Sequence, residues 1–507
     1  MIEANLDYDL LSIQEMREAV RKAKLAQEKY LQFTQEQVDE IVRKAADAAF
    51  AHSAELGEMA VTETGMGVAE HKRIKNQVSS RDVYESIRNV KTVGVINKDS
   101  DKKVIEIADP FGIIAGIIPT TNPTSTAIFK ALISLKTRNA IVVSPHPNAV
   151  KCTIAALKVC YDAAIEAGAP EGIIGWISKP TMPATQELMK HKEIDLILAT
   201  GGGGLVRAAY SSGKPAYGVG PGNVPVYIEK SANIKQSVKR IVDSKTFDNG
   251  TICATEQSLI VDNHVKENVV KQLKSEGAYF LNENEKRLVE KIISPVPRKL
   301  NPDIVGKHAR IIADMAGIEV PKETRLLIAE ETKVGKEIPF SIEKLSPIFA
   351  LYTVSDYKEA LLLSEKLLNL GGRGHTLSIH TTDESIAEEF ALKMPVSRIL
   401  VNTPSAIGAV GGTTGLMPSL TLGCGSFGGN ITSDNITAKH LLNIKRLAYG
   451  IKDVVIPQPS TAGKGQINID EIVEEVVKHV SKENVDSREI ATIVNEILKQ
   501  YERTGNY

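Results

Sequence analysis

From residue 111 onward, short apolar runs alternate with helical stretches, and this alternation constrains the fold more than any other feature of the chain. FGIIAGIIP (111–119), AIVVSP (140–145), IIGWIS (173–178), DLILAT (195–200) and VPVYIE (224–229) have the length and apolar character of buried strands. Helical patterns, such as those over 125–135 and 148–168, separate these runs. Strands that alternate with crossover helices form parallel sheets, so we expect an α/β fold.

The regions on either side of this alternation have a different character. The first hundred residues read as helices, with a charged run over 10–31 and then Thr34 and Gln37 at the spacing of a capping box. A second α/β unit extends over about 232–430 and contains strands such as SLIVD (258–262) and RILVN (398–402). PQPSTAGKGQ (457–466) has the composition of a linker. Apolar residues three and four apart then predict two amphipathic helices, over about 468–481 and 487–501.

Charge and cysteine content exclude several classes of protein. The chain has 61 Lys and Arg against 62 Asp and Glu, a net charge of -1, so no global field attracts nucleic acid or anionic lipid. Its N-terminus lacks the basic and apolar regions of a secretory signal, and its apolar runs are too short to span a membrane. The four cysteines form no C-x-x-C pair and no disulfide framework. We therefore expect a cytoplasmic protein.

A glycine run and a cysteine are the strongest candidates for chemistry. TGGGGL (200–205) follows a predicted strand and precedes a helix, where backbone N–H groups can hold a phosphate, although an unliganded tight turn would look the same. Cys253 lies on a turn between elements, whereas Cys152 and Cys160 lie on the apolar side of a helix and are predicted core residues. Cys424 lies among glycines, and the pattern does not rank it below Cys253 as a nucleophile.

Three further residues stand in rigid or glycine-rich loops. Asn122 and Glu343 lie in proline-containing segments at the ends of elements, and His375 lies in GGRGHTLS. None of the histidines shows the spacing of a metal site, so no metal is expected. Taken together, the strand and helix alternation, the glycine run and Cys253 predict a nucleotide-binding α/β enzyme with a candidate thiol nucleophile.

Six segments together resemble the coenzyme A-acylating branch of the aldehyde dehydrogenase superfamily. They are PTTNPTSTAIFKALISLKTRNAIVVSPHPNA, LATGGGGLVRAAYSSGKPAYGVGPGNVPVYIEKSANI, FDNGTICATEQSLIVD, EKLSP, GGRGHT and PSLTLGCGSFGGN. They occur in the family's order over about residues 10 to 450, as in the aldehyde dehydrogenase half of bifunctional aldehyde-alcohol dehydrogenases and in bacterial microcompartment enzymes.

The resemblance implies a division into domains. It places a Rossmann-type cofactor domain at 1–95 and 112–230 and an α/β catalytic domain at 231–435. A small β oligomerisation element at 96–111 and 436–456 implies a homodimer or homotetramer. A linker at 457–466 and an amphipathic extension at 467–507 complete the expected organisation.

The resemblance also assigns roles to residues. Cys253 matches the nucleophile, Asn122 matches the amide that forms the oxyanion hole with the Cys253 N–H, and His375 is placed near the thioester or CoA. Glu343 matches the ligand of the nicotinamide ribose. The other implied cofactor contacts are Pro119, Thr120, Ser144, His146, Pro147, Thr200, Gly201, Gly202, Gly203, Gly204, Gly220 and Pro347. His146 stands where many relatives carry a lysine, and with no basic residue evident nearby for a 2′-phosphate we expect NAD rather than NADP.

The chemistry implied by these matches is oxidation of an aldehyde to acyl-CoA. Hydrolytic relatives carry a general-base glutamate near the position of Val219, but GVGPGNVP (218–225) has no carboxylate, so coenzyme A rather than water is expected to resolve the Cys253 thioester. The expected substrate is a short aldehyde, acetaldehyde or propionaldehyde. Three alternatives stay open: a hydrolytic aldehyde dehydrogenase, a non-catalytic scaffold that presents the C-terminal helices, and an acyl hydrolase that uses Cys253 and His375.

The C-terminal extension has two interpretations. Its amphipathic helices are too short to be stable alone in water, so they need a partner surface. One interpretation is that they pack on their own subunit or pair across the oligomer. The other follows from the resemblance, because microcompartment enzymes carry similar helices that direct them to a protein shell, and it places the enzyme inside a bacterial microcompartment.

Overall fold

The computed structural model describes residues 7–456, 469–480 and 486–503. The chain forms two compact units, one of residues 1–100 and 104–447 and the other of residues 101–103 and 448–507. The first unit begins with helices, and the capping box of Thr34 and Gln37 is confirmed at the start of the second of them. These helices are α1 (Tyr8–Tyr30), α2 (Gln35–Ala51), α3 (Ser53–Thr64), α4 (Ala69–Gln77) and α5 (Val83–Ile87).

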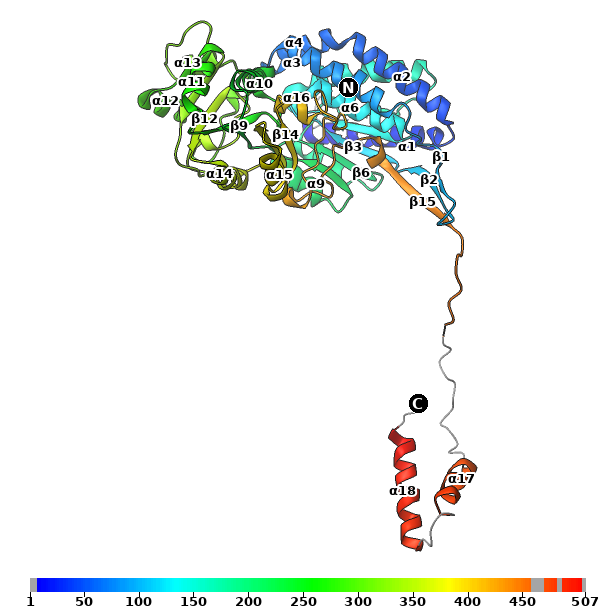
Figure 1. Cartoon of the computed structure of the whole chain (residues 1–507). Coiled ribbons are helices and arrows are strands. Elements are labelled where there is room, and N and C mark those ends of the chain that lie inside the picture. The colour runs from blue at the N-terminus through cyan, green and yellow to red at the C-terminus, as the bar shows by residue number, and fades with distance from the viewer. Residues whose placement is uncertain (1–6, 457–468, 481–485, 504–507) are drawn as a thin grey trace. The chain divides into compact units, whose positions relative to one another are not determined.

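A five-stranded parallel sheet follows in the first unit (Figure 1). Its strands, in spatial order, are β5 (Ile174–Trp176), β4 (Ala140–Ser144), β3 (Ile113–Ile117), β6 (Leu196–Thr200) and β7 (Ala216–Val219). The crossover helices are α6 (Pro123–Lys136), α7 (Val150–Glu166), α8 (Met182–Lys190) and α9 (Gly203–Tyr210). Because the strand order reverses between β3 and β6, a crevice forms at their carboxyl ends, where Rossmann-type folds bind ligands.

A seven-stranded parallel sheet forms the other half of this unit. Its order is β10 (Ala278–Phe280), β11 (Leu326–Glu330), β12 (Ile348–Val354), β9 (Glu256–Asp262), β8 (Val224–Ile228), β13 (Gly374–His380) and β14 (Val396–Val401). Its helices are α10 (Ile234–Thr246), α11 (Lys266–Ser275), α12 (Glu283–Ile293), α13 (Ala309–Met315), α14 (Tyr357–Leu370), α15 (Glu384–Lys393) and α16 (Ser405–Ala409).

One strand belongs to a different sheet from the one we predicted. The alternation placed VPVYIE last in the first sheet, and the resemblance ended the cofactor domain at residue 230, but β8 pairs with β9 and β13 at the centre of the second sheet. Every residue of β8 is buried. An apolar run of this kind fits a central position in either parallel sheet, so its pattern does not identify its partners.

A small antiparallel sheet and two separate helices complete the described chain. The segments expected to form a small β element contain β1 (Gly94–Asp99), β2 (Val104–Pro110) and β15 (Leu442–Ala448), in the order β1-β2-β15. In the second unit the predicted helices are confirmed as α17 (Ile469–Val480) and α18 (Ser487–Arg503), which contact each other. The predicted linker at 457–466 lies outside the described residues. No helix among the described segments is long and apolar enough to cross a membrane.

Candidate active site

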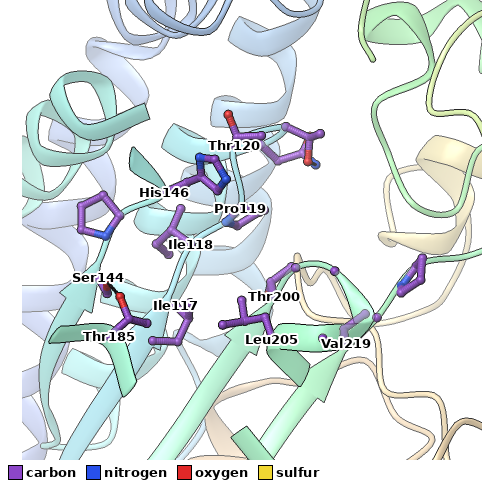
Figure 2. Close-up of a pocket in the computed structure, with 18 of the residues that line it drawn as sticks. Ile117, Ile118, Pro119, Thr120, Ser144, His146, Thr185, Thr200, Leu205 and Val219 are labelled. Atoms are coloured by element: carbon purple, nitrogen blue, oxygen red, sulfur yellow. Dashed lines mark hydrogen bonds between the residues drawn. The ribbon is translucent and has the colours of Figure 1, made fainter. Parts of the chain in front are cut away.

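A cavity of about 740 Å³ opens at the carboxyl ends of β3 and β6. Figure 2 shows Thr200, Leu205 and Val219 on one side of it and Ser144 with Thr185 on the other. The loops after β3, β4, β6 and β7 and one face of α8 supply most of the lining, and Thr251, Cys253, Glu343 and Leu345 enter from the other half of the unit. Its size is that of a typical ligand pocket. The cavity therefore joins the predicted nucleotide site to the predicted nucleophile.

Cys253 is the cysteine whose side chain reaches this cavity. The chain turns sharply just before it, because Asp248, Asn249 and Gly250 all have positive φ. Cys152 and Cys160 are buried core residues, as predicted, and Cys424 is also buried, with 4% of its surface exposed, so it does not rival Cys253 in access. Burial raises the pKa of the Cys253 thiol to about 12, with a further contribution from the negative charge of Glu343. The thiol is therefore protonated at rest at neutral pH.

Asn122 lies beside the loop that carries the nucleophile. It precedes α6, whose first residue is Pro123, and it lines the cavity. Its side-chain NH₂ group donates to the Thr251 carbonyl at 3.3 Å and to the Thr121 hydroxyl at 3.1 Å. Its Oδ1 accepts from Lys75 Nζ at 2.5 Å. The structure thus brings an oriented amide to the loop that carries Cys253.

Glu343 and Gly222 form a second contact in the site. Glu343 Oε1 accepts a hydrogen bond from the Gly222 N–H at 2.9 Å, and burial raises the pKa of Glu343 to about 8. A Cβ atom on Gly222 would lie 2.2 Å from the Cys253 carbonyl oxygen, so this close approach requires glycine. The tight packing ties the Glu343 carboxyl to the backbone that carries Cys253.

His375 is not among the residues that line the cavity. It is fully buried behind Gly222, where an added Cβ would lie 3.2 Å from its ring. Its Nδ1 lies 3.0 Å from the Thr376 hydroxyl, and in the described part of the chain its Nε2 has no hydrogen-bond partner. Burial lowers the pKa of His375 to about 3, with a smaller contribution from Arg398. The imidazole is therefore neutral at physiological pH.

The predicted dinucleotide contacts surround the crevice. The cavity lining includes all of them except Gly203 and Pro347, namely Pro119, Thr120, Ser144, His146, Pro147, Thr200, Gly201, Gly202, Gly204, Gly220 and Glu343. Gly202 caps α9, and the first N–H groups of a helix have no partner within the helix. A Cβ atom on Gly202, Gly204 or Gly220 would meet no atom within 4 Å. The N–H groups of this helix start and the room beside these glycines fit the phosphates of a dinucleotide.

One face of α8 contributes residues that we did not predict. Met182, Thr185, Gln186 and Met189 line the cavity. Their spacing of three, four and seven residues is that of a single helical face, and this was the signal that could have identified them. The Thr185 hydroxyl lies 2.7 Å from that of Ser144 (Figure 2). Across the residues that the structure describes, no group of His, Cys, Asp and Glu is arranged to hold a metal ion.

The fold and this site define an aldehyde dehydrogenase. Residues 6–286 match the model of the aldehyde dehydrogenase family, and the chain belongs to that family. It is 57% identical to an acetylating aldehyde dehydrogenase from Geobacillus thermoglucosidasius, whose crystal structure superposes with a TM-score of 0.88 over 89% of this chain and 100% of that one.

Two further relatives differ in length or in identity. The chain is 47% identical over 472 residues to the bifunctional aldehyde-alcohol dehydrogenase of Escherichia coli K12. The matched region covers 91% of this chain and 53% of that protein. It thus spans about half the length of the aldehyde-alcohol dehydrogenases that it matches. A propionaldehyde dehydrogenase from the fucose utilisation microcompartment of Clostridium phytofermentans is 28% identical, with a TM-score of 0.78 over 86% of this chain and 97% of that one.

Proposed function

We propose that this chain oxidises a short aldehyde to acyl-CoA with NAD⁺ as hydride acceptor. The observation that carries the proposal is that a single cavity holds the Cys253 thiol, the Asn122 amide and the glycine-rich start of α9. Acetaldehyde and propionaldehyde are the substrates favoured by the names of the acetylating and propionaldehyde relatives.

The residues suit the steps of this reaction. Cys253 loses its proton and adds to the aldehyde carbon, and the Asn122 amide with the Cys253 N–H stabilises the resulting oxyanion. Glu343 and the glycine-rich start of α9 would hold NAD⁺ as the acceptor of the hydride from this carbon, and Cys253 would then carry a thioester. The thiolate of coenzyme A attacks the thioester carbon and Cys253 leaves as a thiolate. One aldehyde, one CoA and one NAD⁺ give one acyl-CoA, one NADH and one proton.

The cavity supplies no free carboxylate to activate water. Val219, near the position of the general base in hydrolytic relatives, is buried and apolar. Glu343 is the single acidic residue of the lining, and it is held by the Gly222 N–H. A thiol needs less help than water because it ionises more readily and is more nucleophilic. The site therefore favours coenzyme A as the acyl acceptor.

The lining favours NAD over NADP. None of the lining residues is Lys or Arg, and burial lowers the pKa of His146, which keeps its ring neutral. A 2′-phosphate on the bound cofactor would therefore meet no cation among the residues that line the cavity.

The test is a product assay on the purified full chain. Propionaldehyde with NAD⁺ or NADP⁺ is incubated with and without CoA, and products are identified by mass spectrometry. We expect NADH and propionyl-CoA in equal amounts, no turnover by Cys253→Ala, and most of the activity in Cys424→Ala. Many turnovers to propionate without CoA would instead identify a hydrolytic enzyme, and propionyl-CoA hydrolysis without NAD⁺ an acyl hydrolase.

We also propose that the enzyme is a homo-oligomer that works inside a bacterial microcompartment. The support for assembly is the small β1-β2-β15 sheet, in which β15 is an edge strand with mostly exposed residues. The support for the compartment is the relative from the Clostridium phytofermentans microcompartment together with the two amphipathic helices of the second unit.

A further inference from the structure

Two lysines of α4 are buried next to the active site, around a single carboxylate. The side chains of Lys72, Lys75 and Asp248 are 2%, 4% and 0% exposed. Asp248 Oδ2 accepts from both ammonium groups and from the Thr251 hydroxyl, and Oδ1 accepts from the Val68 N–H at 2.7 Å. Buried charges are costly unless they are fully paired, and here the carboxylate is saturated with donors.

Lys75 connects this cluster to the side chain of Asn122. Its Nζ contacts Asp248, the Thr251 hydroxyl at 3.0 Å and Asn122 Oδ1 at 2.5 Å. An ammonium group has three protons to donate and accepts none, so these three contacts use all of its protons. The amide must therefore present its oxygen to Lys75, because a flipped amide would place its NH₂ group against the ammonium.

We propose that Lys75 is a positioning residue for the oxyanion hole: its ammonium group holds the Asn122 amide with the oxygen inward and the NH₂ group toward the bound carbonyl. The inference rests on the proposed function, in which Asn122 stabilises the oxyanion. Of the present NH₂ contacts, the one to the Thr251 carbonyl is long at 3.3 Å, and the one to the Thr121 hydroxyl is 3.1 Å. One of these protons is therefore available to the oxyanion without disturbing the contact to Lys75.

The charges of the cluster support this role. Burial lowers the pKa of Lys75 to about 8, against the opposing effect of Asp248. Burial acts to raise the pKa of Asp248, but the two lysines outweigh it and hold that pKa at about 2. Both groups are therefore mostly ionised at pH 7. A charged donor binds the Asn122 oxygen more strongly than a neutral one would, so the amide is fixed before the substrate arrives.

Lys72 provides a matched control within the same cluster. It contacts the same Asp248 oxygen at 3.0 Å, but its other contact is the backbone carbonyl of Thr121, at 2.9 Å, rather than the Asn122 side chain. Lys72→Met and Lys75→Met each remove one buried ammonium from the same carboxylate. Only Lys75→Met also removes the donor to the Asn122 amide.

The experiment is a double-mutant cycle on the full chain, with kcat measured as propionyl-CoA formation. We expect Lys75→Met to lower kcat about 10- to 100-fold, with the Kd for NAD⁺ changed less than about twofold. Lys72→Met is expected to lower Tm to a similar extent but kcat less than about threefold. In an Asn122→Ala background, Lys75→Met is expected to add no further loss of kcat, because its effect passes through Asn122.

Two outcomes would overturn the inference. They are equal losses of kcat in the two lysine variants, and a further loss from Lys75→Met in the Asn122→Ala background. If Lys75→Met does not fold, Lys75→Gln replaces it in both backgrounds and keeps a neutral NH₂ donor. It is expected to lose less than about tenfold in kcat with Asn122 present and nothing further with Asn122→Ala. A wild-type enzyme that makes no acyl-CoA would refute the proposed function instead.

Discussion

The charge of the Glu343 carboxyl opposes ionisation of the Cys253 thiol in the cavity that both residues line. Burial and, to a smaller extent, the negative charge of Glu343 together raise the pKa of Cys253 to about 12. Burial also raises the pKa of Glu343 to about 8, against the Gly222 N–H and the nearby lysines. Below pH 8 Glu343 is therefore mostly neutral and has little effect on the thiol, whereas above pH 8 its negative charge opposes thiolate formation.

This pair predicts a pH-dependent difference in the reactivity of Cys253. Alkylation of the free enzyme by iodoacetamide is expected to accelerate with pH, because the thiolate is the reactive form. Glu343→Gln is expected to match the wild type below about pH 8 and to react several-fold faster above it. The measurement is the labelling rate of the Cys253 peptide by mass spectrometry from pH 6 to 10. The Cys253→Ala variant keeps the buried Cys152, Cys160 and Cys424, so it measures the background labelling of these three residues. A Glu343→Gln profile parallel to the wild type at every pH would contradict the interaction.

Among the elements, α9 and the loop before it make the dinucleotide site testable without disturbing the fold. Gly204 lies in the first turn of α9, and a methyl group there meets no atom within 4 Å. Gly204→Ala is therefore expected to leave Tm unchanged or slightly raised, since alanine favours a helix. Gly204 lines the cavity, so we expect the added methyl group to take up space in it.

Gly204→Ala is accordingly expected to raise the KM for NAD⁺ on the order of tenfold while the KM for the aldehyde changes little. Steady-state kinetics with either substrate varied, together with a melting curve, measure the effect. Gly335→Ala is the control. A Cβ added at Gly335 also has room, with the nearest atom at 3.9 Å, but Gly335 is not among the residues that line the cavity. An unchanged KM for NAD⁺ would place the pyrophosphate elsewhere.

At the scale of elements, apolar periodicity predicted most strands and helices but not their partners. The runs that became β3, β4, β5 and β6 were found because each is short, apolar and bounded by turn residues. The run that became β8 looks the same, and its neighbours depend on contacts with β13, some 150 residues away in the chain. Lys72, Lys75 and Asp248 could not be predicted to meet, because charged side chains are normally exposed and the loop of Asp248 is distant from α4 in sequence.

On the scale of the whole molecule, the cavity and the C-terminal helices belong to different units. All cavity-lining residues lie between 117 and 345, in the first unit. After β15, the exposed residues Tyr449, Ile451, Val454, Val455 and Ile456 form a dense apolar segment, and Val455 is 91% exposed. An apolar segment of this kind indicates a contact with another surface. Its position directly after the predicted assembly strand favours a second copy of the chain.

Two truncations and one fusion separate catalysis, assembly and targeting. Deletion of 458–507 is expected to leave kcat and oligomer mass nearly unchanged, because the cavity, β15 and the apolar segment remain. Deletion of 449–507 removes that segment and is expected to reduce the oligomer mass measured by light scattering.

Residues 467–507 fused to a fluorescent protein are expected to enter shells when shell proteins are co-expressed. If the shorter deletion abolishes activity and the fusion stays diffuse, α17 and α18 instead pack on the enzyme itself. Because α17 exposes the apolar residues Val473 and Val477, either a shell protein or the enzyme itself must cover them.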